Sequence, residues 1–388
     1  LFERNKTAYQ NDVNHRITAS LLHKHDEDNR QRTLMVKAGY FNEHIGFIDS
    51  VSNINGDNNA QSLISSAKHS WNKTNYVNDV STSFILGANA GLHWVQTRDY
   101  NQLSNYQYPF RNAAISARFQ QKGFAQKWLY ALGLKTENFM ERTAYGFDAV
   151  GKYRVNEKLN VSLFGGKTYK FPTFNDLFWL PGGNDNRVPE EAYKGHLQLE
   201  WMPEIKVVNL KFWLQAHSAY VENWIMWLPN SRGIWQAENV KTVWSRGLDF
   251  KYSLTKFYRW KYLIKFSGNY AYTRTENLGN SLFVNEGTQL SYVPFHKTNQ
   301  FLSITRHNTS IRWHYQMVGK RFTNADNSEQ LPAYHLNHLR LNYRKQLFNF
   351  SFQVNNLFNV DYQSTLVHPM PWRNFSITVN YNLKKLTK

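Results

Sequence analysis

Residues that could hold a metal ion or act as a catalytic base are scattered through this sequence. It has fourteen histidines and no cysteine, which excludes thiol catalysis, disulfides and cysteine-ligated metals. His23 and His25 lie two residues apart and would face one side of a strand, where a polar surface explains them better than a metal pair. His335 and His338, three apart, would face opposite sides. Since no spacing is typical of a Ser–His–amide or Asp–His catalytic group, we predict no enzyme activity, no metal site and no cofactor.

Large aromatic side chains in long polar segments are better candidates for binding. These aromatics are Phe178, Trp179, Trp224, Trp227, Trp235 and Trp372. Tryptophan is also typical of the boundary between a membrane and water, which would account for most of them without a ligand. Trp179 and Trp235 are expected further into loops, where they could stack on a large ligand. The ligand-contact residues that we predict, all in expected outer loops, are Phe178, Trp179, Asn184, Asp185, Arg187 and Trp235.

Alternation of apolar and polar residues with a period of two runs through most of the chain. In the segment 375–383, Phe375, Ile377 and Val379 alternate with small polar residues, and segments 264–273, 311–317 and 350–355 repeat the pattern. The alternative is a soluble antiparallel sandwich with one solvent-exposed face. Large apolar members throughout, charged polar members in many strands, and strands of about nine to twelve residues or more favour a transmembrane antiparallel β-barrel. We therefore predict an all-β fold.

Composition supports this prediction, although the mean hydropathy is only −0.61. No segment approaches the ~18 apolar residues of a membrane-spanning helix. Aromatic residues make up 16% of the chain, as expected if a barrel needs an aromatic girdle at each membrane interface. The formal net charge of +18 is spread over strands and turns, which argues against nucleic acid and favours lipopolysaccharide or an anionic ligand as partner.

Predicted connections alternate between short and long. Short turns are expected near 27–32, 121–126, 155–159, 203–206, 256–260, 307–309 and 345–348. Long connections are expected near 172–192, 228–239, 273–296, 320–333 and 359–373. Bacterial outer-membrane barrels have short periplasmic turns and long extracellular loops. The spacing predicts about 16 to 18 strands, a number compatible with a porin or with part of a larger barrel.

Four motif-like segments follow one another after residue 160. The first is Gly166–Phe178, which contains Pro172 and Leu177. The second comprises Gly183-Asn184, Val188-Pro189-Glu190-Glu191 and Glu200, and the third comprises Glu238-Asn239-Val240 and Arg246-Gly247-Leu248-Asp249. The fourth is Asn356-Leu357-Phe358-Asn359-Val360-Asp361-Tyr362. In this order they resemble the C-terminal barrel of TonB-dependent transporters of the vitamin B12 and siderophore type. The run Asp185-Asn186-Arg187 and the residue Asp249, where the family usually has Glu, depart from its pattern.

These motif residues also have simple architectural interpretations. Pro172 has no N–H and should end a strand ladder. Asn356 and Asn359 can cap backbone groups where a strand enters a loop. Gly247 should permit a bulge or a close approach of backbone.

The resemblance implies a longer protein, with a TonB-contacting segment and a plug before a 22-stranded barrel. We identify no plug motif, and expect residues 1–388 to be the C-terminal barrel part, without the first four to six strands. Implied partners are TonB–ExbB–ExbD through a plug not present in this chain, a bulky small molecule and outer-membrane lipid or lipopolysaccharide, with a surface lipoprotein as an open alternative. The expected function is TonB-dependent import of an iron–siderophore, cobalamin or similar ligand by an integral protein of the bacterial outer membrane. Two alternative hypotheses are a passive porin and a barrel that serves as a structural partner in an envelope complex.

Overall fold

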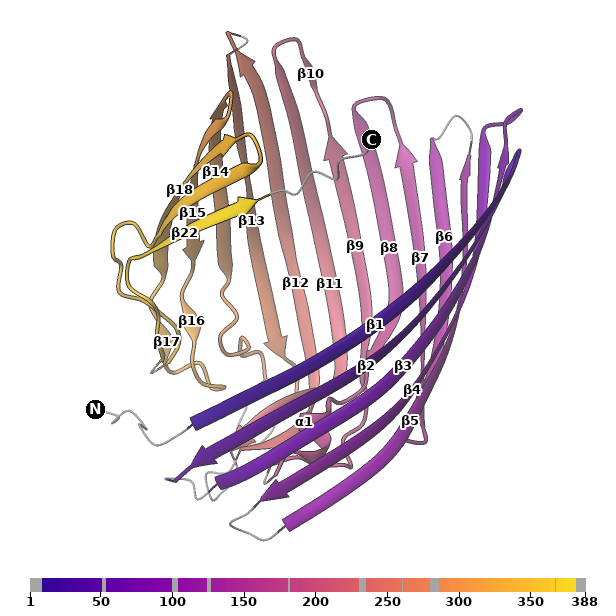
Figure 1. The fold of residues 1–388 in the computed structure, drawn as a ribbon, viewed down its shortest axis with the longest axis vertical. Helices are drawn as coiled ribbons and strands as arrows, with labels where there is room; N and C mark the ends of the chain where they lie inside the picture. Colours follow the sequence, from indigo (N-terminus) through magenta and orange to yellow (C-terminus); the bar gives the residue numbers. More distant parts are fainter. Residues whose placement is uncertain are drawn as a thin grey trace. The chain divides into compact units, whose positions relative to one another are not determined.

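The computed structural model consists almost entirely of long antiparallel strands (Figure 1). It describes residues 9–50, 54–99, 104–123, 127–180, 182–229, 235–259, 261–279, 286–366 and 368–381. One helix of five residues, α1 (Phe174–Phe178), lies within these ranges. No helix of the described residues is long and apolar enough to span a membrane. The chain divides into two compact units: the first comprises Leu1–Tyr153, Leu163–Gly195 and Ala219–Val243, and the second comprises Arg154–Ser162, His196–Ser218 and Trp244–Lys388.

The first unit contains the long N-terminal strands and α1. Its complete strands are β1 (Tyr9–Glu27), β2 (Arg30–Asp49), β3 (Ile54–Asn75), β4 (Val80–Asp99), β5 (Ser104–Gly123) and β6 (Trp128–Phe139), followed by β7 (Arg142–Arg154), whose last residue belongs to the second unit. Parts of β8 (Leu159–Lys170), β9 (Glu190–Trp201), β11 (Val208–Pro229) and β12 (Trp235–Tyr258) complete it. Consecutive strands from β1 to β7 pair antiparallel without a register shift.

The second unit contains the C-terminal strands. They are β10 (Glu204–Ile205), β13 (Tyr262–Asn277), β14 (His296–Arg306), β15 (Thr309–Val318), β18 (Tyr334–Lys345), β19 (Phe348–Asn355) and β22 (Asn374–Tyr381). Two small hairpins, β16 (Arg321–Phe322) with β17 (Gln330–Leu331) and β20 (Gln363–Thr365) with β21 (His368–Pro369), lie in its long loops. Among the described residues, one antiparallel sheet contains eighteen strands, which confirms the predicted 16 to 18.

Alternation along the strands gives the first unit an apolar face and a polar face. Side chains that lie in one register row across β2–β7 are Leu34, His69, Leu86, Ala117, Leu134 and Phe147, and they belong to the apolar face. The row displaced by one residue belongs to the polar face, with Met35, Lys68, Gly87, Ser116, Lys135 and Gly146. Leu86 and Leu134 are 41% and 66% exposed, as expected for a face that contacts lipid instead of a protein core.

Aromatic side chains border the apolar face near the short turns of the first unit. Trp71 lies 5.8 Å from Phe84, and Trp128 lies 4.2 Å from Tyr153, between ring centroids. Phe119 and Tyr130 form a further pair at 6.1 Å. These pairs fit the predicted interface girdle.

The bounds of one predicted connection were wrong. The sequence predicted a long loop over 228–239, but β11 continues to Pro229 and β12 begins at Trp235. The residues on either side are rich in Trp, Ile, Met and Val, which favour strands, so the hairpin ladder extends beyond the point where the polar composition suggested a loop.

Candidate functional site

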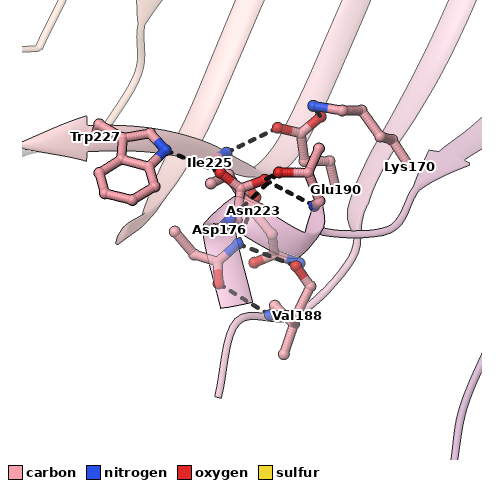
Figure 2. A network of polar contacts seen from close by, with 9 residues as sticks. Lys170, Asp176, Val188, Glu190, Asn223, Ile225 and Trp227 are labelled. Atoms are coloured by element: carbon pink, nitrogen blue, oxygen red, sulfur yellow. Dashed lines mark hydrogen bonds and ion pairs between the residues drawn. The ribbon is translucent and has the colours of Figure 1, made fainter. Parts of the chain in front are cut away.

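The loop that follows β8 begins with a short, fully capped helix. Pro172 lies two residues after the end of β8 at Lys170, where a strand end was predicted, and α1 starts two residues later. Thr173 caps the helix: its hydroxyl accepts from the backbone N–H of Asp176, and the Asp176 carboxylate accepts from the Thr173 N–H at 2.8 Å and hydroxyl at 2.7 Å. The second carboxylate oxygen accepts from the indole N–H of Trp227, at 2.9 Å (Figure 2). Asp176 is 7% exposed and therefore ties the helix to β11.

Gly183 and Asn184 fold the chain back onto α1. The Gly183 N–H donates to the carbonyl of Trp179, and the Asn184 N–H donates to the carbonyl of Asp176 at 2.8 Å. A Cβ on Gly183 would come within 2.8 Å of the Phe178 backbone nitrogen, so a side chain cannot be accommodated without a shift. The glycine of this motif is therefore required by packing.

Asn239 fastens the end of the same loop to the β11–β12 hairpin. Its side-chain oxygen accepts from the Val188 N–H at 3.0 Å, and its amide nitrogen donates to the carbonyls of Val188 and Asn223 (Figure 2). Asn223 adopts a φ of 55°, a left-handed conformation that asparagine tolerates better than most residues. Next to this clamp, Glu190 accepts from the Ile225 N–H at 2.9 Å.

Charged side chains hold the middle of the loop. Arg187 pairs with Glu238 at 2.7 Å, and the Arg187 side chain is only 16% exposed. Arg142, at the β6–β7 turn, donates to the carbonyls of Arg187 and Asp185. The Nε of Arg187 is buried and has no hydrogen-bond partner among the described residues. Residues 173–180 and 182–190 thus form a braced platform, which we call the 173–190 platform.

An aromatic cluster lies beneath this platform. β5 pairs with β6 only from Asn112 onward, so residues 104–111 of β5 extend past the β6–β7 hairpin. Against this extension, Phe178 stacks on Tyr108 at 4.4 Å, and Phe174 contacts Phe110 edge-to-face at 5.2 Å. The cluster includes the buried residues Val95, Phe139, Leu177 and Phe178.

Most of the predicted contact residues lie in this loop, but they differ in how far they are buried. Phe178 is 5% exposed in the aromatic cluster, and Trp179 lies against Phe47, with 6.1 Å between ring centroids. Asp185 is exposed. Asn184 and Arg187 are partly buried, and both form contacts within the brace. Trp235 begins β12, and its side chain lies outside the described residues.

Sequence reasoning missed a polar chain that crosses the wall below α1. Ser62 contacts His93 Nδ1 at 2.8 Å, and His93 Nε2 contacts Asn112 at 3.0 Å. Asn112 donates to Glu137, which also accepts from Tyr169 at 3.1 Å. Each of these residues lies on a different strand. Their contacts depend on the register between strands, which the spacing of residues in the sequence does not reveal.

Asparagines cap the loop between β19 and β22 in the second unit, as predicted. The Asn356 side chain both donates to and accepts from the backbone of Val360 at 2.8 Å, and Asn359 accepts from the Arg373 N–H at 2.9 Å. Both asparagines adopt positive φ, of 50° and 54°.

Arg321, in the neighbouring loop, donates to the carbonyls of Gly319, Pro332 and Gln363. Burial lowers the pKa of its guanidinium, yet arginine stays charged at neutral pH. The cation therefore joins two outer loops through their backbone.

Gly247 confirms the predicted close approach of backbone. A Cβ at this position would overlap the carbonyl oxygen of Tyr272 and lie 3.0 Å from the His217 ring. Among the described residues, no group of three or more His, Asp or Glu side chains is placed to hold a metal ion.

The family model described as "TonB dependent receptor-like, beta-barrel" matches residues 2–357. The chain belongs to this family. The TonB-dependent receptor barrel described here is 25% identical to the vitamin B12 transporter BtuB of Photobacterium profundum over 228 residues, which are 56% of this chain and 36% of that protein. It is 27% identical over 88 residues to the vitamin B12 transporter BtuB of Vibrio vulnificus, covering 22% of this chain and 14% of that protein. It therefore spans about a third or less of these relatives' lengths.

Solved structures share the barrel fold. The copper transporter OprC aligns with a TM-score of 0.74 and 13% identity, over 97% of this chain and 67% of its own. The ferric citrate transporter FecA aligns with a TM-score of 0.72 and 10% identity, over 96% and 62%. At these identities the likeness establishes the fold, an all-β antiparallel barrel of the TonB-dependent class. The family and these neighbours are receptors and transporters, and not enzymes.

Proposed function

We propose that this chain forms the barrel of an integral outer-membrane receptor that binds a scarce, bulky ligand at its outer loops and imports it actively. The observation that supports this most is the braced platform of residues 173–190. Asp176, Gly183, Asn184, Glu190 and Asn239 hold its backbone at many points. A loop fixed in this way loses little conformational entropy when a ligand binds, which favours high affinity.

The proposed ligand contact is the outer surface of this platform. Trp179 offers an aromatic ring at the edge of the cluster, and Asp185 is exposed beside the partly buried Arg187. Phe178 supports the platform from below, since its side chain is buried. Trp235, at the start of the neighbouring hairpin, completes the predicted contact set as a proposal from sequence alone.

An iron–siderophore or cobalamin is the proposed ligand class. Many siderophores are anionic, which the net charge of +18 would favour. Coupling to TonB–ExbB–ExbD is assigned to a plug domain, none of whose motifs we identify in these 388 residues. Outer-membrane lipid or lipopolysaccharide surrounds the barrel in this proposal, and a surface lipoprotein is an additional candidate partner.

A deletion strain tests the proposal. Growth and uptake are measured on iron–siderophore and cobalamin sources, with and without TonB, after complementation with the complete gene. The proposal expects at least one source whose uptake needs both the gene and TonB. Uptake of every source at wild-type rates in the deletion strain would refute it.

A further inference from the structure

Two arginines lie directly opposite each other in the second unit. Arg312 of β15 and Arg340 of β18 pair in register, and the two strands lie side by side (Figure 1). Along their strands the arginines alternate with the apolar residues Ile311 and Leu341, which are 50% and 42% exposed. Successive side chains of a strand point to opposite faces, so the arginines belong to the polar face, which lines the lumen in a barrel of this kind.

The strands around this arginine pair carry no carboxylate that neutralises it. The sequences of β14, β15, β18, β19 and β22 contain no Asp or Glu, and neither do the short turns at residues 307–308 and 346–347. In β13, the next strand, the one carboxylate is that of Glu276, which pairs with Arg246 at 2.7 Å. Like charges directly opposite each other destabilise an antiparallel pair of strands, so an anion at this point would stabilise the wall.

The register rows on either side of the arginine pair have partners within the wall. Toward the outer loops, His314 stacks on His338 with 5.1 Å between ring centroids, and its Nε2 contacts the side-chain oxygen of Asn299 at 3.2 Å. Toward the short turns, the side chain of Asn342 donates to the hydroxyl of Ser310 at 3.2 Å. The polar side chains of these two rows therefore contact one another, whereas the arginines between them face a like charge.

Two buried polar atoms beside the pair have no partner within the wall. The Nε of Arg340 and the Oγ of Ser351 are buried, and neither has a hydrogen-bond partner among the described residues. The whole Ser351 residue is 7% exposed. Arg340 pairs in register with Gln353, and Ser351 lies two residues from Gln353 on the same face, so the two atoms belong to neighbouring positions. Because buried polar groups are normally hydrogen-bonded, two unmet atoms that can both donate favour an acceptor from outside the wall.

The arginine pair lies nearer the short turns than the outer loops. Arg312 is three residues from the start of β15 at Thr309 and six residues from its end at Val318, or about 10 Å and about 20 Å along the strand at ~3.4 Å per residue. The pair belongs to the second unit, whereas the 173–190 platform belongs to the first. It is therefore separate from the outer surface that we propose as the first ligand contact.

We infer that Arg312 and Arg340 form a site in the lumen for a small oxyanion with two or more negative charges. A guanidinium presents a planar fork of N–H donors that matches the oxygens of a carboxylate or phosphate group. Two forks on adjacent strands suit a multivalent anion, and the Ser351 hydroxyl adds a donor beside them. The inference deepens the proposed import function and rests on it, because it gives the anionic part of an imported ligand a site on its way through the barrel.

Sulfate binding by the complete receptor tests the inference. The receptor is purified in a nonionic detergent and titrated with sodium sulfate in a calorimeter, while sodium chloride keeps the ionic strength constant. The test variant is Arg312→Gln combined with Arg340→Gln. The matched control is Arg306→Gln combined with Lys345→Gln, which removes the same charge from β14 and β18 at positions of the opposite, lipid-contacting face. Circular dichroism and heat-modifiable migration confirm folding of each variant.

The wild type and the control should bind sulfate saturably, and the double arginine variant should bind it about tenfold more weakly or less, because both guanidinium forks are lost. Absence of binding by the wild type, as expected if an acidic side chain elsewhere in the complete protein occupies the two arginines, would overturn the inference. Equal affinity of all three proteins, or an equal loss in the control, would also overturn it, because binding would then not depend on this pair. The titration involves no import, so a failed uptake experiment would refute the proposed function without changing this readout.

Discussion

Replacing Asp176 by asparagine should loosen the ligand platform while leaving the barrel folded. The carboxylate accepts three hydrogen bonds, two from Thr173 and one from Trp227, and it is 7% exposed. An asparagine side chain has one accepting oxygen, so either the Trp227 bond or the Thr173 pair must be lost. Hydrogen bonds to charged groups contribute about 1.5–3 kcal/mol each. We therefore expect Asp176→Asn to reduce the free energy of loop opening by about 2–3 kcal/mol.

Hydrogen exchange of backbone amides measures this effect directly. A reduction of about 2–3 kcal/mol raises the open fraction roughly 30- to 140-fold, and exchange of the N–H groups of Asp176, Leu177 and Asn184 should accelerate by a similar factor. The matched control is Asp185→Asn, since Asp185 lies in the same loop and is exposed. Amides of β3 and β4 provide an internal reference. Unchanged exchange in Asp176→Asn, or equal acceleration in both variants, would refute the claim that the Asp176 carboxylate holds the loop closed.

Three further predictions follow from single contacts. Gly247→Val should prevent assembly, because its side chain would overlap the Tyr272 carbonyl, and the heat-modifiable band on a gel should disappear; normal assembly would contradict the packing. Asn356→Ala should lower the free energy of opening of the outer loop by about 2–3 kcal/mol, because two hydrogen bonds to Val360 are lost and alanine disfavours the left-handed φ. Proteolysis within residues 356–373 should become faster, and less so in Asn356→Gly; an unchanged rate would contradict the cap. Asn239→Ala should weaken ligand binding to whole cells about tenfold without lowering the amount of receptor. Unchanged affinity would show that the Asn239 clamp does not contribute to ligand binding.

The barrel was predictable because its signal repeats along the chain. Period-two alternation fixes which residues face lipid, and aromatics at the strand ends mark the interfaces. Pro172, Gly247 and Asn356 carry local information, since each is a residue type required by the backbone around it. These architectural predictions were confirmed.

The ligand platform could be predicted only in outline. The short helix α1 lies inside a predicted loop, because five residues are too few to show helical periodicity. Burial of Phe178 depends on the extension of β5 beyond β6, a long-range feature that no local pattern contains. Trp227, which donates to Asp176, and Val188, which donates to Asn239, each lie 51 residues from their partner, so these contacts became visible only with the fold.

Initial rates of ligand accumulation over a range of external concentrations test the central claim most directly. The ligand is the one identified with the deletion strain, and rates are compared between cells with and without TonB. Active import through this receptor predicts saturable accumulation at low concentration that is lost without TonB, while ligand binding at the cell surface persists. Accumulation that rises linearly with concentration and is unchanged without TonB would indicate a passive pore and would contradict the account.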